Sequence, residues 1–380
     1  MTPSEILQLL YTEALEMVNA KTLPEFPKEI TANVDILIDK IDKNKSLMSA
    51  LITSCIKKIT NPEQDIRLHK AEFSNGYSAR GLDTDITAPF FKLHFPRYAN
   101  KESAFLTMAT RARIEWTKTA GQILPIRDSA VKTSFLNIID AVENATVNPQ
   151  NVIRYVFIKL YELSLTQKTV FDDTIETSDF LGIININTVL EMLEKHFACK
   201  WSSRLPVIAI YSVYEQLFKQ VKRYHGKILC PLNVHTSSDK HGYGDVEIWN
   251  ADNTPFEIAE IKHNIPIDRN LIFDIVKKSE GTPIKRYYIL TTAKDNFVST
   301  EEEQYIGKFV LKIQKDIGLD VIANGIQYSL KYYLRFIDGY KEFIKSYTQN
   351  LVEDANISTE VQEFHISAWR EILQKYQLEG

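Results

Sequence analysis

Cysteine is scarce in this sequence of 380 residues: there are three, Cys55, Cys199 and Cys230, and they are far apart. Their odd number and wide spacing exclude a disulfide framework and a zinc site built from cysteine alone. The first residues lack the basic and apolar regions of a signal peptide. No apolar run reaches the ~20 residues that a membrane-spanning helix needs. We therefore expect a cytoplasmic protein with no membrane partner and with buried free thiols.

Internal repeats, low-complexity segments and glycine-rich phosphate loops are also missing from the sequence. Without such a loop after a strand, the sequence disfavours an ATP-driven translocase and a methyltransferase. An excess of positive charge is missing too, because the formal net charge is −4. A surface that binds nucleic acid must then be a local cluster of Lys and Arg. The length and the hydrophobic content of 44% allow two or three domains with a large core.

Two runs of alternating residues predict a β-hairpin in the second half of the chain. The first is Gly244–Trp249 and the second is Phe256–His263. Apolar and charged residues alternate along the first run, which is typical of a strand with one buried face. The residues between the runs, Asn250–Pro255, are of the types that form tight turns. We expect two antiparallel strands joined by this turn.

Charged side chains converge at one end of this hairpin. The two-residue period of a strand places Glu260 and Lys262 on one face and Ile261 on the other. If Asp245 enters its strand beside them, two carboxylates and an ammonium group lie together, and the carboxylates repel unless a cation separates them. Mg²⁺ is bound in many proteins by one or two carboxylates together with water and phosphate oxygens. The pattern favours Mg²⁺-dependent cleavage of a phosphodiester, with Lys262 serving the attacking water.

The same hairpin also fits a surface role without chemistry, since exposed hairpins often carry Asp, Glu and Lys. Two other acids of the hairpin are expected to stay outside the site. Glu257 is out of phase with Lys262, so we expect it to be exposed or bound to a neighbour. Glu247 shares the face of Asp245, where an exposed cross-strand charge is the simpler interpretation and an accessory ligand the alternative.

Asp245, followed after fourteen residues by Glu260-Ile261-Lys262, resembles the signature of the PD-(D/E)XK nucleases, which include most type II restriction endonucleases. Gly244 stands where the name-giving pattern has proline. The resemblance implies that Asp245 and Glu260 hold Mg²⁺, that the backbone carbonyl of Ile261 completes the metal shell, and that the products are a 5′-phosphate and a 3′-hydroxyl. It also implies a helix before the first strand that can offer a further acid, and Glu215 is the only acid on the expected helix of residues 204–221.

The order of the expected elements agrees with that fold class, a mixed α/β or α+β core of the restriction-endonuclease type. After the helix come strands at 227–230, 244–249 and 256–263, a helix from 266 to 281, a strand at 286–292, a helix at 301–317 and a strand at 319–323. Residues 201–327 would form this catalytic core. Residues 1–200 read as a mostly helical DNA-recognition region, and residues 328–380 as a helical C-terminal extension.

Two polar segments are candidates for contact with double-stranded DNA. Residues 72–92 show no helical period, and their Tyr-Ser-Ala-Arg and Pro-Phe elements resemble a block found in some type II restriction endonucleases. Arg pairs well with guanine and Asn with adenine in the major groove, so the expected contacts are Asn75, Tyr77, Ser78, Arg80, Asp83 and Thr84. An ordered loop that packs two helical layers together is the alternative. The loop before Asp245 offers groups suited to phosphate oxygens: Ser237, Ser238, Lys240 and His241.

The sequence therefore predicts a type II restriction endonuclease that cuts double-stranded DNA with Mg²⁺. A palindromic site presents two equivalent strands, so we expect a homodimer. The resemblance also implies a companion DNA methyltransferase that acts separately. Two alternatives stay open: a nuclease of the same fold that recognises a repair intermediate or junction, and a non-catalytic DNA-binding protein.

Overall fold

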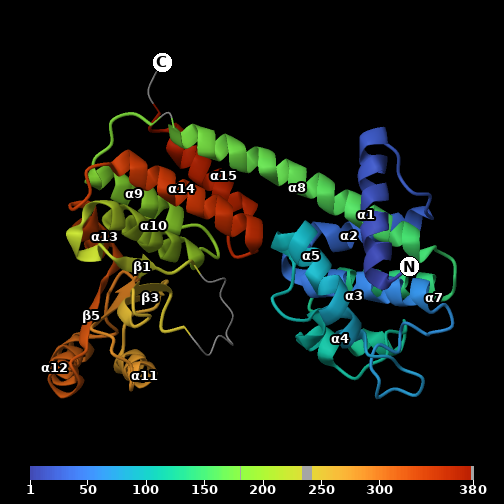
Figure 1. The fold of residues 1–380 in the computed structure, drawn as a ribbon, viewed down its shortest axis with the longest axis horizontal. Helices are drawn as coiled ribbons and strands as arrows, with labels where there is room; N and C mark the ends of the chain where they lie inside the picture. The colour runs from blue at the N-terminus through green and yellow to red at the C-terminus, as the bar shows by residue number, and fades with distance from the viewer. Residues whose placement is uncertain (180, 233–241, 378–380) are drawn as a thin grey trace. The chain divides into compact units, whose positions relative to one another are not determined.

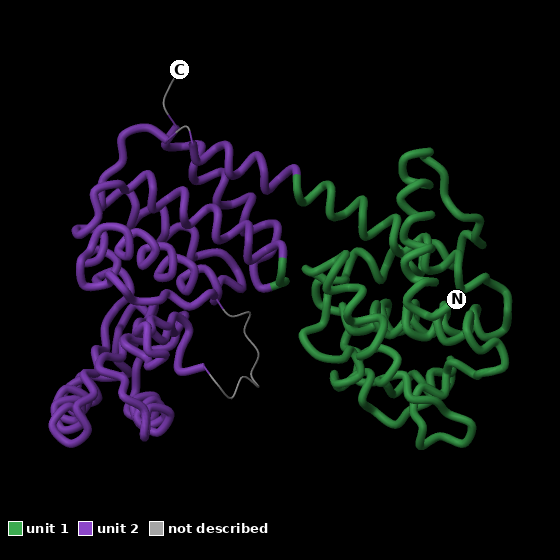
Figure 2. The backbone as a smooth tube through the Cα atoms, viewed as in Figure 1, with its two compact units in different colours: residues 1–168, 357–359 green, residues 169–356, 360–380 purple. Residues whose placement is uncertain are grey.

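The computed structural model describes residues 1–179, 181–232 and 242–377 and divides the chain into two compact units (Figure 2). The first unit consists of residues 1–168 and 357–359, and the second of residues 169–356 and 360–380. The predicted boundaries after residues 200 and 327 both fall inside the second unit. The chain is therefore divided differently from the prediction, because the C-terminal helices share one hydrophobic core with the sheet.

The first unit is helical, as predicted. Its core centres on α3, in which every residue from Leu47 to Ile56 is buried. The first helix, α1, begins with a capping box: the side chain of Thr2 accepts the Glu5 amide, and the side chain of Glu5 accepts the Thr2 amide. The helices are α1 (Pro3–Ala20), α2 (Lys28–Asp39), α3 (Ile41–Thr60), α4 (Ala79–Leu82), α5 (Ala88–His94), α6 (Met108–Arg111), α7 (Ser129–Glu143) and α8 (Pro149–Asp179), whose last residues belong to the second unit.

The prediction of an irregular segment over residues 72–92 is wrong for its second half. Helix α4, a π-helical turn at Asp83–Thr87 and α5 follow one another there without a break. The cause is a tertiary contact, because the Asp83 carboxylate is fully buried and accepts four hydrogen bonds. The donors are Ser49 Oγ (2.7 Å), Thr53 Oγ1 (3.3 Å), Ser103 Oγ (2.8 Å) and the Ala104 amide (2.8 Å).

The second unit combines one sheet with helices on both of its faces, which confirms a mixed α/β architecture. The strands are β1 (Lys227–Leu229), β2 (Val246–Asn250), β3 (Pro255–Lys262), β4 (Arg286–Thr291) and β5 (Asp320–Gly325). The helices are α9 (Ile186–Phe197), α10 (Arg204–Gln220), α11 (Arg269–Ser279), α12 (Thr300–Ile317), α13 (Ile326–Leu334), α14 (Tyr340–Ile357) and α15 (Glu363–Gln374). The strands and helices predicted between residues 204 and 323 are all present, with small shifts at their ends.

The five strands are hydrogen-bonded in the order β1-β2-β3-β4-β5. The pairs β1/β2 and β2/β3 are antiparallel, whereas β3/β4 and β4/β5 are parallel and are connected through α11 and α12. In Figure 1, α11 and α12 lie on one side of the strands and α9 and α10 on the other. Side chains alternate accordingly: Ile261 packs with α10 and the C-terminal helices, and Ile258 packs with α11 and α12.

In the part of the chain that the structure describes, no helix has both the length and the apolar composition that are needed to cross a membrane.

We expect Asp83→Ala to destabilise the first unit by about 3 kcal/mol, because the substitution leaves several buried donors without an acceptor. The measurement is urea denaturation followed by circular dichroism. The control is Asp85→Ala, which removes an exposed carboxylate two residues away and should change the free energy of unfolding little. Equal stability of the two variants would contradict a structural role for the buried carboxylate.

Candidate functional site

The predicted hairpin is formed by β2 and β3. Val246 pairs with Ala259, and Ile248 pairs with Glu257. The turn between the strands is closed by hydrogen bonds between Asn250 and Thr254, and Asn253 adopts a positive φ of 61° that asparagine tolerates well. β3 continues beyond Val246, the first residue of β2, so its last residues lie at an edge of the sheet that β2 does not cover.

Asp245 fills this uncovered position. Because Val246 pairs with Ala259, the preceding residue Asp245 lies opposite Glu260. Its amide donates to the Ala259 carbonyl (2.9 Å), and its Oδ2 accepts the Ile261 amide (2.7 Å). The carboxylate thus replaces the next bond of the antiparallel ladder. In such a ladder the N–H and C=O of one residue point to the same side, so the Ile261 carbonyl also points toward Asp245.

Glu260 and Lys262 lie on one face of β3, as the two-residue period predicted. Lys262 Nζ donates to Glu260 Oε1 at 2.6 Å. The side chain of Glu260 is 12% exposed and that of Lys262 is 27% exposed. Both groups are therefore sheltered, but a molecule at the edge of the sheet can reach them. The structure brings the side chains of Asp245, Glu260 and Lys262 and the backbone of Ile261 together.

Tyr287 on β4 is a member of this cluster that the sequence did not reveal. Its hydroxyl donates to the Tyr243 carbonyl (2.5 Å) and lies 3.5 Å from Glu260 Oε2. Burial, followed by the negative charges of Glu260, Asp245 and Glu247, raises the Tyr287 pKa well above its ordinary value. The hydroxyl therefore stays protonated and remains a donor. The only signal in the sequence was a hydroxyl inside an apolar strand, which needs a buried partner.

Glu247 organises the segment that leads into Asp245. It is buried, so the prediction of an exposed cross-strand charge is wrong. Its Oε1 accepts the amides of Tyr243 (2.6 Å) and Gly244 (3.3 Å), and its Oε2 accepts Trp249 Nε1 (2.8 Å). These bonds occupy the carboxylate as a structural acceptor and fix the backbone immediately before Asp245.

Gly244 allows this segment to lie directly against β3. A Cβ atom at this position would lie 2.5 Å from Ile258 Cγ2 and 2.9 Å from the Ala259 carbonyl oxygen. Proline would meet the same crowding, and it would also remove the amide that donates to Glu247. The departure from the proline of the nuclease signature therefore has a local steric reason in this chain.

Glu257 lies on the face of the sheet opposite Glu260. It is completely buried, so it is not exposed to solvent. The other alternative, that it is bound to a neighbour, is confirmed. Arg223 forms an ion pair with it (3.0 Å), and the hydroxyls of Tyr214 (3.1 Å) and Tyr224 (3.5 Å) donate to its Oε1. This network joins α10 to the sheet on the side away from Glu260.

Glu215 is not brought to the two carboxylates. It lies on α10, which covers the face of β3 opposite Glu260. Its Oε2 accepts Asn350 Nδ2 (2.7 Å) and the hydroxyl of Ser346, both from α14. Within residues 1–179, 181–232 and 242–377, no three His, Cys, Asp or Glu side chains form a group that could hold a metal ion. The structure thus gives Glu215 helix-packing partners in place of the predicted ligand position.

The predicted DNA contacts of the first unit divide into exposed and buried residues. Four are exposed: Asn75, Ser78, Arg80 and Thr84. Tyr77 and Asp83 are buried, and for these two side chains contact with DNA is not compatible with the fold. Asp83 holds α4 and α5 in place, and the Tyr77 hydroxyl lies 3.5 Å from Ser54 Oγ. The other predicted contacts, Ser237, Ser238, Lys240 and His241, lie outside the described residues.

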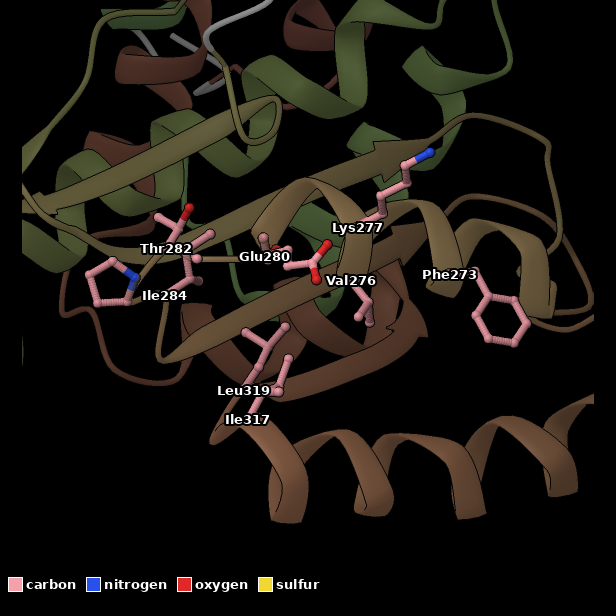
Figure 3. A pocket seen from close by; sticks show the side chains of 11 residues that line it. Phe273, Val276, Lys277, Glu280, Thr282, Ile284, Ile317 and Leu319 are labelled. Atoms are coloured by element: carbon pink, nitrogen blue, oxygen red, sulfur yellow. The ribbon is translucent and has the colours of Figure 1, made fainter.

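Residues that the structure describes line at least two sizeable cavities in the second unit. One, of about 490 Å³, lies where β3, β4 and β5 end, and its wall includes His263, Thr292 and Gly325. The other, of about 580 Å³, lies at the opposite end of β4. In Figure 3, Glu280, Thr282 and Ile284 face Ile317 and Leu319 across this second cavity. We name them the strand-end cavity and the apolar cavity.

The donor set at the sheet edge fits a hard divalent cation. Asp245, Glu260 and the Ile261 carbonyl supply oxygen ligands from one side only, and Mg²⁺ is commonly bound by so few protein groups, with water and phosphate oxygens as the remaining ligands. Lys262 adds a positive charge at the same edge. Two carboxylates, a carbonyl and an ammonium group can together orient a phosphate and an attacking water.

We expect Gly244→Ala to destabilise the second unit by about 2 kcal/mol, because the new methyl group overlaps Ile258 and the Ala259 carbonyl. The measurement is chemical denaturation followed by tryptophan fluorescence. Gly307→Ala is the matched control: this glycine lies within α12 with open space around its Cα, so alanine should stabilise the helix by about 0.5–1 kcal/mol. Effects of the same sign would contradict the close approach at Gly244.

Removing the hydroxyl in Tyr287→Phe should loosen the segment from Tyr243 to Asp245, because the Tyr243 carbonyl loses its donor. We expect faster hydrogen–deuterium exchange of the Gly244 and Asp245 amides with little change in the rest of the sheet. Tyr288→Phe on the same strand is the control, since its ring points to the opposite face. Unchanged exchange at Gly244 and Asp245 would show that Tyr287 does not hold this segment.

We compared the chain with models of known protein families and with curated proteins. Neither comparison finds a match. The chemistry of the edge formed by Asp245, Glu260 and Lys262 therefore has to be inferred from the residues of this chain.

Proposed function

We propose that the protein is a Mg²⁺-dependent endonuclease of the restriction type, with a PD-(D/E)XK core in its second unit. The observation that carries the proposal is the meeting of Asp245, Glu260, Lys262 and the Ile261 carbonyl at one edge of a mixed sheet. Further support comes from the order of the elements around it. Helix α10 precedes three strands that pair antiparallel, β1, β2 and β3, and α11 and α12 connect the three parallel strands β3, β4 and β5.

Asp245, Glu260 and the Ile261 carbonyl would hold Mg²⁺, which when bound supplies Lewis acidity and lowers the pKa of a bound water. Lys262 donates one of its three protons to Glu260, so two remain for a phosphate oxygen or for the attacking water. Its positive charge stabilises the transition state, in which negative charge builds up on the phosphate. Water attacks phosphorus as the bond to O3′ breaks, which leaves a 5′-phosphate and a 3′-hydroxyl.

The surrounding residues keep these groups oriented before substrate arrives. Tyr287 lies against the second oxygen of Glu260, and Glu247 fixes the backbone that carries Asp245. Such support restricts carboxylates to one geometry, and its loss typically reduces metal affinity ten- to a hundredfold, on the order of the effects measured for outer-shell residues. Tyr287 and Glu247 are positioning residues in this proposal, because they act through Glu260 and Asp245.

The first unit would read the DNA. Its exposed Asn75, Ser78, Arg80 and Thr84 supply amide, hydroxyl and guanidinium groups, which suit base edges and phosphates. Recognition of a palindrome would require a homodimer with one cutting site for each strand. A companion methyltransferase acting separately would protect the host DNA. These partners follow from the proposed restriction activity and are part of the same proposal.

One observation favours a second candidate, a nuclease of the same fold that acts on a repair intermediate or junction. The strand-end cavity begins one residue after Lys262 and has room for a single nucleotide. A junction or a damaged site offers such an unpaired nucleotide more easily than intact duplex does. The two candidates differ in substrate, and duplex DNA tested beside branched DNA distinguishes them.

Incubation of the purified chain with unmethylated phage DNA and Mg²⁺ should give discrete fragments, and EDTA should prevent the cleavage. We expect Asp245→Asn, Glu260→Gln and Lys262→Ala each to lower the cleavage rate by about 1,000-fold, because each removes a group that contacts the metal, the water or the phosphate. DNA binding measured by fluorescence anisotropy should persist in Lys262→Ala.

The matched controls carry the same chemical changes on the exposed face of α12. Glu303→Gln and Lys308→Ala should cleave like the unmodified protein. Intact DNA under all conditions, with both duplex and branched substrates and a folded protein, would contradict a nuclease. Equal DNA binding by the unmodified protein and Lys262→Ala, without cleavage by either, would favour the non-catalytic DNA-binding protein.

A further inference from the structure

The strand-end cavity is next to the proposed cutting site but belongs to the other face of the sheet. Lys262 is the last residue of β3, and His263, the next residue, lines the cavity. Its walls come from the ends of β3, β4 and β5, from α9 and from the start of α13. In sheets with parallel strands, ligands commonly bind outside the carboxyl ends of the strands.

Polar groups of the cavity match a nucleobase. Three carboxamides line it, those of Asn264, Asn296 and Gln327. The Asn264 carboxamide is hydrogen-bonded to His263 and Thr292 and belongs to the wall. Asn296 and Gln327 each place a donor beside an acceptor, which is the arrangement that reads the edge of a base. Gly325 makes room for Asn296, because a Cβ atom there would lie 2.6 Å from Asn296 Oδ1.

His263 makes the wall of the cavity rigid. Its Nδ1 is hydrogen-bonded to Thr292 Oγ1 (2.9 Å), and its Nε2 lies 3.0 Å from Ser202 Oγ and 3.0 Å from Asn264 Nδ2. These partners come from three different segments of the chain and hold the ring in one position.

The rim of the cavity supplies an aromatic ring and a cation. Tyr328 is 70% exposed on the first turn of α13, and an exposed ring is a platform for stacking a base. Lys294 is also exposed and lines the same cavity, where its ammonium group can meet a phosphate. One carboxylate, that of Glu194, also lines the cavity, so a phosphate has to lie on the Lys294 side. An aromatic platform, carboxamides and a cation together describe a nucleotide more closely than an apolar ligand.

We propose that the strand-end cavity binds one unpaired nucleotide of the DNA strand, adjacent to the phosphodiester cut at Asp245 and Glu260. This inference rests on the proposed function and narrows its substrate. The volume of about 490 Å³ is in the range of small-molecule sites and holds one nucleotide, whereas a base pair within a duplex does not fit. The nucleotide has to leave its stack, which costs least where the base is mismatched, damaged or already single-stranded.

The apolar cavity at the other end of β4 carries no such inference. Its walls include Val276, Ile284 and Leu319, and nothing in the structure indicates what would occupy it.

Binding of deoxynucleoside 5′-monophosphates and of a tetranucleotide tests the cavity without cleavage. The full chain is titrated in EDTA by isothermal calorimetry. We expect Tyr328→Ala to weaken binding by about tenfold through the loss of stacking, and Gln327→Ala to change the preference among the four bases. Tyr332→Ala is the control, because this tyrosine is 54% exposed on the same helix and does not line the cavity. Glu303→Gln, on the exposed face of α12 and away from the cavity, should bind nucleotides like the unmodified protein.

Failure of this inference differs from failure of the proposed function. No binding by the unmodified protein, or equal weakening by Tyr328→Ala and Tyr332→Ala, overturns the nucleotide site, while Mg²⁺-dependent cleavage would still support a nuclease. The opposite result is also distinguishable. If Tyr328→Ala weakens nucleotide binding but the protein cuts no DNA, the nucleotide site is supported and the proposed nuclease activity is contradicted. A substrate with a mismatch beside the cut should be cleaved faster than matched duplex, and Tyr328→Ala should lose that difference.

Discussion

Two carboxylates, Asp245 and Glu260, lie opposite each other at one edge of the sheet, and like charges in such positions need compensating partners. Each carboxylate has its own donor at the edge of the sheet: Oδ2 of Asp245 accepts the Ile261 amide, and Oε1 of Glu260 accepts Lys262. Charge-assisted hydrogen bonds of this kind are stronger than neutral ones. The two carboxylates can therefore remain side by side at this edge of the sheet.

The two-residue period of β3 places a carboxylate that a solute can reach on one face of the sheet and a buried structural carboxylate on the other. Glu257 and Glu260 are the same kind of residue three positions apart, so they lie on opposite faces. On one face, Arg223 and two tyrosine hydroxyls neutralise and satisfy Glu257 completely. On the other, Lys262 and Tyr287 leave Glu260 partly exposed. A buried carboxylate with all of its partners stabilises a fold, and one that a solute can reach is available for binding.

The sequence was informative where the structure is local. Alternation and turn residues were enough to predict the hairpin and the shared face of Glu260 and Lys262. The strands at 286–292 and 319–323 were also predicted, whereas their parallel pairing was not. Residues 79–94 were missed because a buried carboxylate from Asp83, bound by donors from distant segments, holds them in a helix that shows no clear period. Tyr287 was missed for the same reason. Its partners Tyr243 and Glu260 are remote in sequence, and only the pairing of β3 with β4 brings them near.

The mixed sheet explains why the carboxylates and the strand-end cavity lie at the same edge. β2 runs antiparallel to β3, so the beginning of β2, which carries Asp245, meets the end of β3 at Lys262. β4 and β5 run parallel to β3, so their ends at Thr292 and Gly325 meet the same edge from the other side. If β4 ran antiparallel to β3, its end would lie at the opposite edge of the sheet. If β2 ran parallel to β3, Asp245 would lie at that opposite edge instead. The change from antiparallel to parallel pairing at β3 thus gathers the two carboxylates and the strand-end cavity around one strand end.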